Sequence, residues 1–174
     1  MSTATETASE KVAGDRGGKY LTFALGREEY GLQILKVREI IGFMEITAVP
    51  RTPAYVRGVI NLRGQVISVV DLRDKFAMPP RERTEETCIV VVETTCAGRR
   101  VNIGLIVDRV SEVLNIAAEH IEDAPDFGGS DLDPKFILGM GKIGQAVKIL
   151  LDIDQVLAGD HVAATQAPKA SEAA

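Results

Sequence analysis

Side chains able to do chemistry are few in this chain, and their spacing does not assemble a catalytic group. The two histidines are His120, in an Ala-Glu-His-Ile-Glu stretch typical of a solvated loop or helix start, and His161, near the C-terminus. Neither belongs to an HExxH motif, a spaced set of metal ligands or a Ser/His/Asp arrangement. Cys88 and Cys96 flank one predicted strand without forming a CxxC pair, so packing or surface roles are favoured over a disulfide. We therefore expect no enzyme activity, no cofactor and no metal site.

A glycine pattern of the dinucleotide-binding type occurs at residues 139–144, which read Gly-Met-Gly-Lys-Ile-Gly. That pattern binds a nucleotide where it follows a strand and opens a helix. Here it is followed by an apolar, strand-like run over residues 145–151. We interpret the glycines as a β-hairpin turn, and nucleotide binding at this turn is the enzymatic alternative.

The sharper candidate is Asn61-Leu62-Arg63-Gly64, a stretch of turn-forming residues that carries one cation. Asn and Gly favour a tight, exposed turn, and an arginine on such a turn is most often simply solvated. The other possibility is an ion pair with the carboxylate of Glu39. The residues alone leave a solvated Arg63 and a Glu39–Arg63 pair both open.

Alternation of apolar and polar residues predicts a succession of β-strands. The predicted strands are 19–25, 30–34, 45–50, 56–60, 65–71, 87–95, 100–107, 136–140 and 145–152. Short helical pieces are predicted at 35–41, 72–77, 109–114 and 153–158. Residues 1–18 and 160–174 lack periodicity and are predicted to be disordered tails, so the folded domain is expected to span 19–159.

Charge and hydropathy argue against two kinds of partner. The chain has 25 acidic and 20 basic side chains, and its Lys and Arg residues are scattered, so it lacks the electrostatic footprint of a nucleic-acid-binding protein. Apolar runs such as residues 88–92 are far shorter than the roughly 20 residues that cross a bilayer. The N-terminus lacks a basic segment followed by an apolar one, so no secretory signal is predicted. We expect a cytoplasmic protein.

An internal repeat is the most informative feature of the sequence. Residues 31–41 align without gaps on residues 104–114, with Gly, Leu, Val and Glu in common. Residues 55–59 then align on 136–140, 64–67 on 144–147, and 69–72 on 149–153, in the same order. Several matches in a common order indicate that the two halves share one β fold.

The size of the repeat predicts how the halves are used. Each half spans only about 65 to 70 residues, near the lower limit for an independent core. We therefore expect the halves to pack on each other and to form a groove, a natural place for a binding site. With Gly64 aligned on Gly144, Arg63 is an extra residue that the second half lacks, so the site is expected to lean on the first half.

On these residues the chain resembles the CheW family of bacterial chemotaxis coupling proteins. The resemblance rests on residues 25–31, 34–40, 52–64, 69–73 and 104–113, and it covers about 19–158. It implies a mainly β fold of two SH3-like five-stranded β-barrel subdomains with a few short helices. It also implies a non-catalytic adaptor that couples chemoreceptors, the methyl-accepting chemotaxis proteins, to the histidine kinase CheA at membrane-associated receptor arrays.

The same resemblance implies partners and site residues. The cytoplasmic tip of a chemoreceptor is expected along the groove between the subdomains, and the CheW-like regulatory domain of CheA against the subdomain faces. By motif match, the receptor-binding residues are Val37, Glu39, Gly58, Asn61, Arg63, Gly64 and Val113. The match also favours the ion pair between Glu39 and Arg63. The alternative is that the chain is the regulatory domain of a longer chemotaxis kinase, which ends in a similar module.

Overall fold

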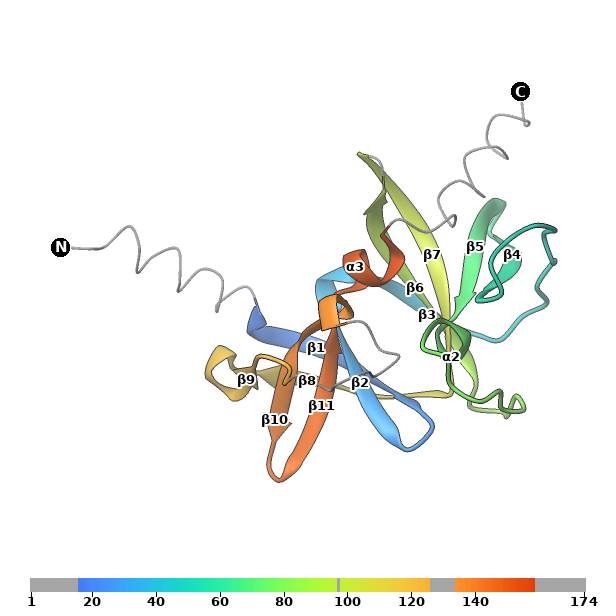
Figure 1. Cartoon of the computed structure of the whole chain (residues 1–174). Coiled ribbons are helices and arrows are strands. Elements are labelled where there is room, and N and C mark those ends of the chain that lie inside the picture. The colour runs from blue at the N-terminus through green and yellow to red at the C-terminus, as the bar shows by residue number, and fades with distance from the viewer. Residues whose placement is uncertain (1–15, 97, 126–133, 159–174) are drawn as a thin grey trace.

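The computed structural model describes residues 16–96, 98–125 and 134–158, which form two mixed β-sheets and a few short helices (Figure 1). The strands are β1 (Gly18–Leu25), β2 (Glu28–Gln33), β3 (Val37–Gly42), β4 (Val56–Leu62), β5 (Gln65–Asp71), β6 (Cys88–Cys96), β7 (Arg99–Val107), β8 (Arg109–Ile116), β9 (Ile121–Glu122), β10 (Ile137–Ile143) and β11 (Ala146–Leu151). The helices are η1 (Ile34–Lys36), α2 (Leu72–Lys75), η2 (Ala118–His120), η3 (Pro134–Phe136) and α3 (Ile153–Leu157). The predicted mainly β fold is confirmed. The tails predicted to be disordered lie outside the described residues, apart from residues 16–18, where β1 begins at Gly18.

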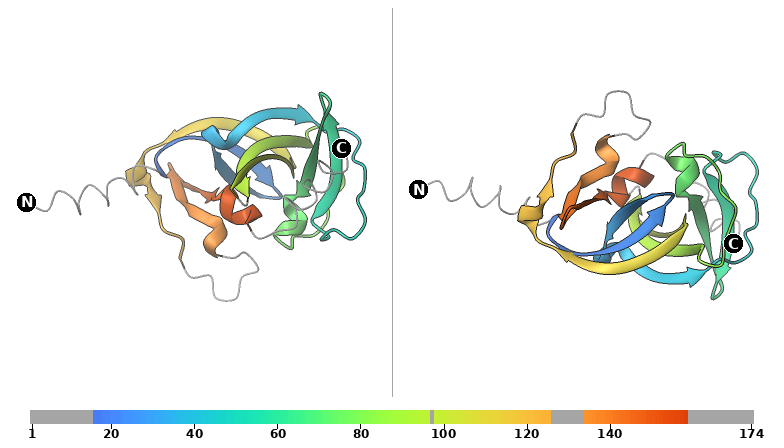
Figure 2. Two further views of the ribbon diagram at one scale, coloured as in Figure 1. Left: turned by 90° about the horizontal axis from the view of Figure 1, so that it is seen from above. Right: turned by 90° about the horizontal axis from the view of Figure 1, so that it is seen from below.

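The two sheets do not coincide with the two halves of the sequence, because the halves exchange their first hairpins. One sheet has six strands in the order β8-β1-β2-β11-β10-β9, and the other has five in the order β3-β6-β7-β5-β4. The β1–β2 hairpin of the first half therefore lies among second-half strands, and the β6–β7 hairpin of the second half lies among first-half strands. Figure 1 shows blue β1 and β2 next to orange β10 and β11, and Figure 2 shows the same neighbours from two further sides.

The exchange is symmetric, and the sequence repeat maps onto it strand by strand. β2 pairs in parallel with β11 through Gly31 and Leu150, and β7 pairs in parallel with β5 through Gly104 and Val69. Within the described ranges the strands pass from one sheet to the other at two points, η1 between β2 and β3, and Asp108 between β7 and β8. Each half thus supplies strands to both sheets, so neither needs an independent core.

Apolar side chains form one core shared by both sheets and one smaller core within each subdomain. The shared core takes Phe23 and Leu32 from the six-stranded sheet and Val90 and Leu105 from the five-stranded sheet. The second core of the five-stranded sheet contains Ile60, Ile67, Val69, Ile89 and Val91, and that of the six-stranded sheet contains Tyr20, Ile116, Ile121 and Leu150. The central strands are therefore buried on both faces, and this joins the subdomains as one unit.

Two segments predicted as short helices are strands. The helical prediction for 35–41 and 109–114 is wrong, because only η1 is helical there and the remaining residues form β3 and β8. Each strand carries a one-residue bulge, at Arg38 in β3 and at Ser111 in β8. A bulge shifts the alternation of faces by one residue, so apolar positions recur at three and four residues and imitate a helix. The two bulges occupy the same position in the repeat.

The predicted strand over 45–50 is also wrong. Thr47 alone pairs there, in an isolated antiparallel bridge with Val59. Pro50 and Pro53 cannot donate to a strand ladder, and Arg51 has a left-handed φ of 65°. The segment therefore runs as an irregular linker from β3 to β4.

An ion pair ties each crossing between the sheets to a short helix. The Asp108 carboxylate accepts hydrogen bonds from Arg73 of α2 at 2.9 and 2.6 Å and from the Gly26 amide at 2.7 Å; we call this the inner clasp. Lys36 of η1 donates to Asp154 of α3 at 2.7 Å, and this is the outer clasp. Arg73 and Asp154 occupy equivalent repeat positions, so the charges are reversed. The inner pair is more buried, with side chains 11% and 17% exposed against 33% and 38% for the outer pair.

The clasps predict a loss of stability in acid. Burial acts to raise both carboxyl pKa values, but hydrogen bonds from Arg73 to Asp108 and from Lys36 to Asp154 outweigh it and leave each pKa below its ordinary value. A lowered pKa in the folded state stabilises fully above the unfolded value of about 4, and this contribution is lost as the pH falls through the folded value. Asp74, whose pKa is raised mainly by burial, opposes the trend. Urea midpoints should therefore be level from about pH 7 to 5 and fall below about pH 4. A midpoint that rises on acidification would show that the inner and outer clasps do not stabilise the folded state in this way.

Candidate functional site

The candidate site is built on the tight turn between β4 and β5. Leu62 pairs with Gln65, which leaves Arg63 and Gly64 as a two-residue turn. Their φ angles of 52° and 86° are both left-handed, the pattern of a type I′ hairpin turn. The side-chain oxygen of Asn61 accepts a hydrogen bond from the Gly64 amide at 2.8 Å. The turn is thus held by its own polar groups, as turn-forming residues predict.

Arg63 and Glu39 form a two-pronged ion pair that joins this turn to β3. The two guanidinium nitrogens Nη1 and Nη2 donate to the two carboxylate oxygens at 2.8 and 2.7 Å, a geometry that fixes the orientation of both groups. The hydrogen bond from Arg63 holds the pKa of Glu39 below its usual value, so the pair stays charged at neutral pH. The prediction that Glu39 and Arg63 pair is confirmed. The Arg63 side chain is 71% exposed, so its cation stays accessible at the surface.

The sequence alignment around Arg63 needs one correction. In the second half Ile143 pairs with Ala146, so Gly144 and Gln145 form a two-residue turn of the same length. Arg63 therefore takes the place of Gly144, whose φ of 60° is also left-handed, and it is not an extra residue. The asymmetry between the halves is chemical, an arginine in one turn and a glycine in the other. The predicted hairpin is confirmed, because β10 continues into β11 and not into a helix. The glycines do not all lie in its turn, since Gly139 and Gly141 are within β10 and only Gly144 is in the turn.

Gly58 supports the site through its backbone conformation and its lack of a side chain. It has a φ of 144°, and a Cβ built there would lie 2.0 Å from the carbonyl oxygen of Thr47. This close approach lets Thr47 and Val59 exchange two backbone hydrogen bonds of 2.9 Å, which hold the linker before β4 against that strand. Gly58 therefore positions the strand that carries the Arg63 turn.

The two valines of the predicted site lie on different sheets. Val37, on β3 with Glu39, packs against the shared core. Val113, on β8 of the six-stranded sheet, is 49% exposed, and none of its described contacts joins it to the Glu39–Arg63 pair. Sequence reasoning missed Ile40, which is 45% exposed on β3. The repeat carried the signal, because Ile40 aligns with Val113.

The remaining candidate chemical groups do not gather. His120 is exposed on η2, and His161 lies outside the described residues. Cys88 is a free, half-buried thiol whose pKa is raised by burial. Across residues 16–96, 98–125 and 134–158, no three His, Cys, Asp or Glu side chains are placed to hold a metal ion. In the same ranges no helix has the length and apolar character to cross a membrane.

Known proteins with similar sequence and structure agree with this architecture. Residues 19–161 match the family described as CheW-like domain. The chain is 39% identical over 163 residues to the chemotaxis protein CheW of Klebsiella aerogenes, covering 94% of this chain and 93% of that protein. It is 37% identical over 141 residues to a probable chemotaxis protein CheW of Rhizobium etli, covering 81% and 86%. The crystal structure of the scaffolding protein TtCheW from Thermoanaerobacter tengcongensis superposes with a TM-score of 0.72 at 34% identity, covering 81% of this chain and 92% of that one.

These matches span both sheets and the segments that carry the Glu39–Arg63 pair. The chain belongs to the CheW family of chemotaxis coupling proteins, which are non-catalytic scaffolds.

Proposed function

We propose that this chain links the cytoplasmic tips of chemoreceptors to the histidine kinase CheA. It would act in the cytoplasm, recruited to membrane-associated receptor arrays. Support comes from the names of its relatives, which are chemotaxis proteins and a scaffolding protein. The physical basis is a rigid pair of sheets joined by one core, on which two binding surfaces keep a fixed distance.

The receptor is proposed to bind at the β3 edge and the β4–β5 turn. The residues assigned to this surface are Val37, Glu39, Gly58, Asn61, Arg63 and Gly64, with Ile40 added from the structure. Val113 is assigned to the same partner but lies on β8 of the six-stranded sheet, so a receptor tip that reaches it would have to lie along the junction of the two subdomains. The observation that carries the assignment is the two-pronged pair between Glu39 and Arg63. It holds an exposed cation in one orientation at the β4–β5 turn, which suits a partner that presents an acidic or polar group there.

CheA is proposed to bind elsewhere, through its CheW-like regulatory domain, on the faces of the two subdomains. With the two hairpin turns aligned as the structure has them, Val66 on β5 is equivalent to Val147 on β11, and they are 39% and 50% exposed. Apolar side chains exposed at equivalent places on two related subdomains suit a partner that is itself built from two such subdomains.

A regulatory domain within a longer kinase is the second candidate. A 25% identical match to the chemotaxis protein CheV3 of Helicobacter pylori covers 40% of that protein, so a related domain occurs within a longer chain. A reading frame that continues upstream of Met1 into phosphotransfer and ATP-binding segments would favour this alternative.

Charge reversal at Arg63 is the direct test of the receptor surface. In Arg63→Glu two carboxylates face each other, so we expect the turn to move away from β3 and capture of receptor tips to fall about tenfold or more. The measurement is a pull-down with purified receptor tips and CheA. The double exchange Glu39→Arg/Arg63→Glu restores opposite charges and should recover part of the binding.

The matched control is Arg27→Glu, a charge reversal on the exposed β1–β2 turn. It should leave receptor capture unchanged, and CheA capture should be normal in every variant. Receptor binding by Arg63→Glu at the wild-type level would show that the site is misplaced.

A further inference from the structure

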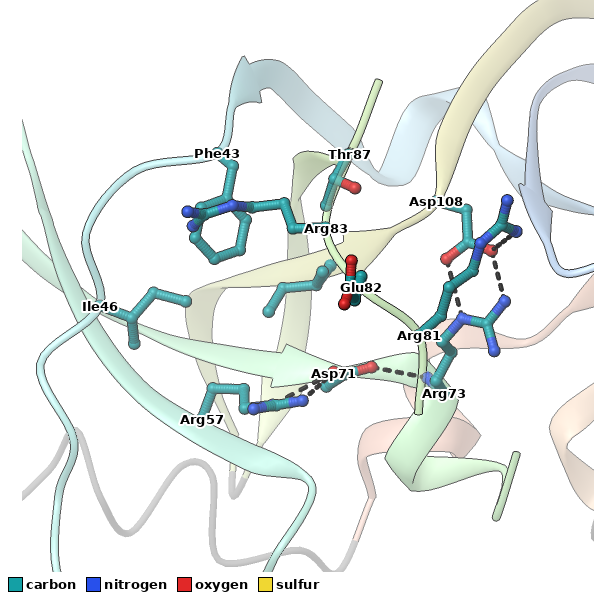
Figure 3. Close-up of a pocket in the computed structure, with 11 residues that line it drawn as sticks. Phe43, Ile46, Arg57, Asp71, Arg73, Arg81, Glu82, Arg83, Thr87 and Asp108 are labelled. Carbon is teal, nitrogen blue, oxygen red and sulfur yellow. Dashed lines mark hydrogen bonds and ion pairs between the residues drawn. The ribbon is translucent and has the colours of Figure 1, made fainter. Parts of the chain in front are cut away.

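A cleft of about 220 Å³ lies at the end of the β4–β5 hairpin away from the Arg63 turn, and the function proposed above does not use it (Figure 3). It opens between the five-stranded sheet, α2 and an exposed segment before β6, residues 79–87, which we call the strap. Its lining is Phe43, Ile46, Arg57, Asp71, Arg73, Arg81, Glu82, Arg83, Thr87, Ile106 and Asp108. Four guanidinium groups from three different elements thus meet in one small space.

Hydrogen-bond donors outnumber free acceptors in this cleft. Asp108 accepts four hydrogen bonds, from the Gly26 amide, from Arg73 twice and from Arg81. Three of them end on Oδ2 and one on Oδ1, so Oδ2 is fully used and Oδ1 can accept one more. Asp71 accepts two from Arg57 and one from the Arg73 amide. The two inner carboxylates therefore have little capacity left for further donors.

Arg83 is the guanidinium of this cleft that has no carboxylate partner among the described residues. Its guanidinium lies over the Phe43 ring at 4.3 Å from the ring centre, and Figure 3 shows the two groups together at one end of the cleft. Within the described ranges no carboxylate pairs with it. The contact with the ring is a cation–π interaction that uses no N–H group of the guanidinium, and a guanidinium can bind a carboxylate with two parallel hydrogen bonds.

The other wall of the cleft is apolar. Ile46 and Ile106 line it together with the ring of Phe43. A simple inorganic anion would leave this wall against water, whereas an apolar group would cover it. The lining therefore favours a ligand that has an anionic group at one end and an apolar group at the other.

We propose that this cleft binds a carboxylate carried on a small apolar body, with Arg83 as its charge partner. The apolar body contacts Ile46 and Ile106. The carboxylate belongs either to a free organic acid or to the C-terminal residue of a peptide, because both present the same group. Glu82 lies on the strap between Arg81 and Arg83 and has no recorded partner among the described residues, so its charge opposes the ligand.

The test is an NMR titration of the ¹⁵N-labelled full chain with hexanoate, with acetate and 1-hexanol as half-ligands. Hexanoate should give saturable shifts at the amides of Phe43, Arg83 and Thr87, and each half-ligand should bind about tenfold more weakly or worse. Arg83→Gln should weaken hexanoate binding about tenfold or more, and Glu82→Gln should strengthen it. Arg99→Gln, on the exposed start of β7, is the matched control and should bind like wild type.

A peptide that ends in leucine, with a free or an amidated C-terminus, separates the two sources. Tighter binding of the free-acid peptide than of hexanoate assigns the site to a protein terminus, and the reverse order assigns it to a free acid. The proposal fails if hexanoate gives no saturable shifts, if the shifts map away from the strap, or if Arg83→Gln binds hexanoate like wild type. A failure here leaves the receptor surface untouched, because Arg83 does not contact the Glu39–Arg63 pair.

Discussion

Replacement of Gly58 by alanine is expected to lower the free energy of unfolding by about 2–5 kcal/mol. An added Cβ would meet the Thr47 carbonyl oxygen at 2.0 Å and its carbon at 2.7 Å, and backbone atoms cannot yield as a flexible side chain does. The φ of 144° is also a conformation that L-residues rarely adopt. Steric conflict and backbone strain therefore add at one position. The measurement is urea unfolding followed by circular dichroism.

The control is Gly144→Ala in the β10–β11 turn. Gly144 has a left-handed φ of 60°, but nothing lies within 4 Å of a Cβ built there. That variant bears only the backbone strain, about 1 kcal/mol. If Gly58→Ala is no less stable than Gly144→Ala, then the close approach to Thr47 is not what Gly58 provides.

Gly58→Ala also separates two roles that the family resemblance does not distinguish, contact with the receptor and support of the backbone. The resemblance placed Gly58 among the receptor-binding residues, while the structure gives it a backbone task next to Thr47. Loss of the Thr47–Val59 bridge should free the linker before β4 and let the Arg63 turn shift. Receptor capture by Gly58→Ala should therefore fall together with stability, whereas in Arg63→Glu it should fall while stability is kept.

The sequence predicted most strands and failed where strands depart from a regular alternation. Strands such as 65–71 and 100–107 have uninterrupted patterns, and they were placed within a residue of β5 and β7. β3 and β8 contain bulges at Arg38 and Ser111, and there the apolar spacing resembled that of a helix. A bulge is set by pairing with a neighbouring strand, which a single segment of sequence does not contain.

The exchange of hairpins between the halves was beyond the reach of sequence patterns. β1 and β6 carry the same kind of alternation, and each would fit beside the strands of its own half or of the other. Periodicity fixes which face of a strand is buried, but not which copy of a repeated partner it meets. The choice depends on the short crossings at η1 and Asp108, whose geometry appears only in three dimensions.

The sequence predicted more of the candidate site than of the contacts that support the fold around it. Turn chemistry at Asn61 and Gly64 predicted the turn, because that signal is local. The residues alone left the pairing of Arg63 open, and the family resemblance favoured Glu39 as its partner. The inner clasp between Arg73 and Asp108 was missed, since its partners lie on separate elements. One signal was present: Arg73 aligns with Asp154, and a reversal of charge between repeat equivalents suggests that each has its own partner.

Removal of the Asp108 carboxylate is expected to be the most damaging change to the junction of the sheets. Asp108→Ala leaves the Arg73 guanidinium, only 11% exposed, without its carboxylate and with only the Pro79 carbonyl oxygen as a side-chain acceptor, and it also frees the Gly26 amide. An unpaired, largely buried charge and an unmet amide together should cost about 2–4 kcal/mol in the free energy of unfolding. Hydrogen exchange at the Gly26 amide should also become faster, a readout specific to this junction.

The outer clasp supplies the comparison. Lys36→Ala removes a pair whose side chains are 33% and 38% exposed, so solvent screens it and the expected cost is at most about 1 kcal/mol. A double-mutant cycle of Asp108→Ala with Arg73→Ala should show strong coupling, because each single change already breaks the same contact. If Asp108→Ala costs no more than Lys36→Ala and the Gly26 amide exchanges as in wild type, then the shared core alone holds the two sheets together.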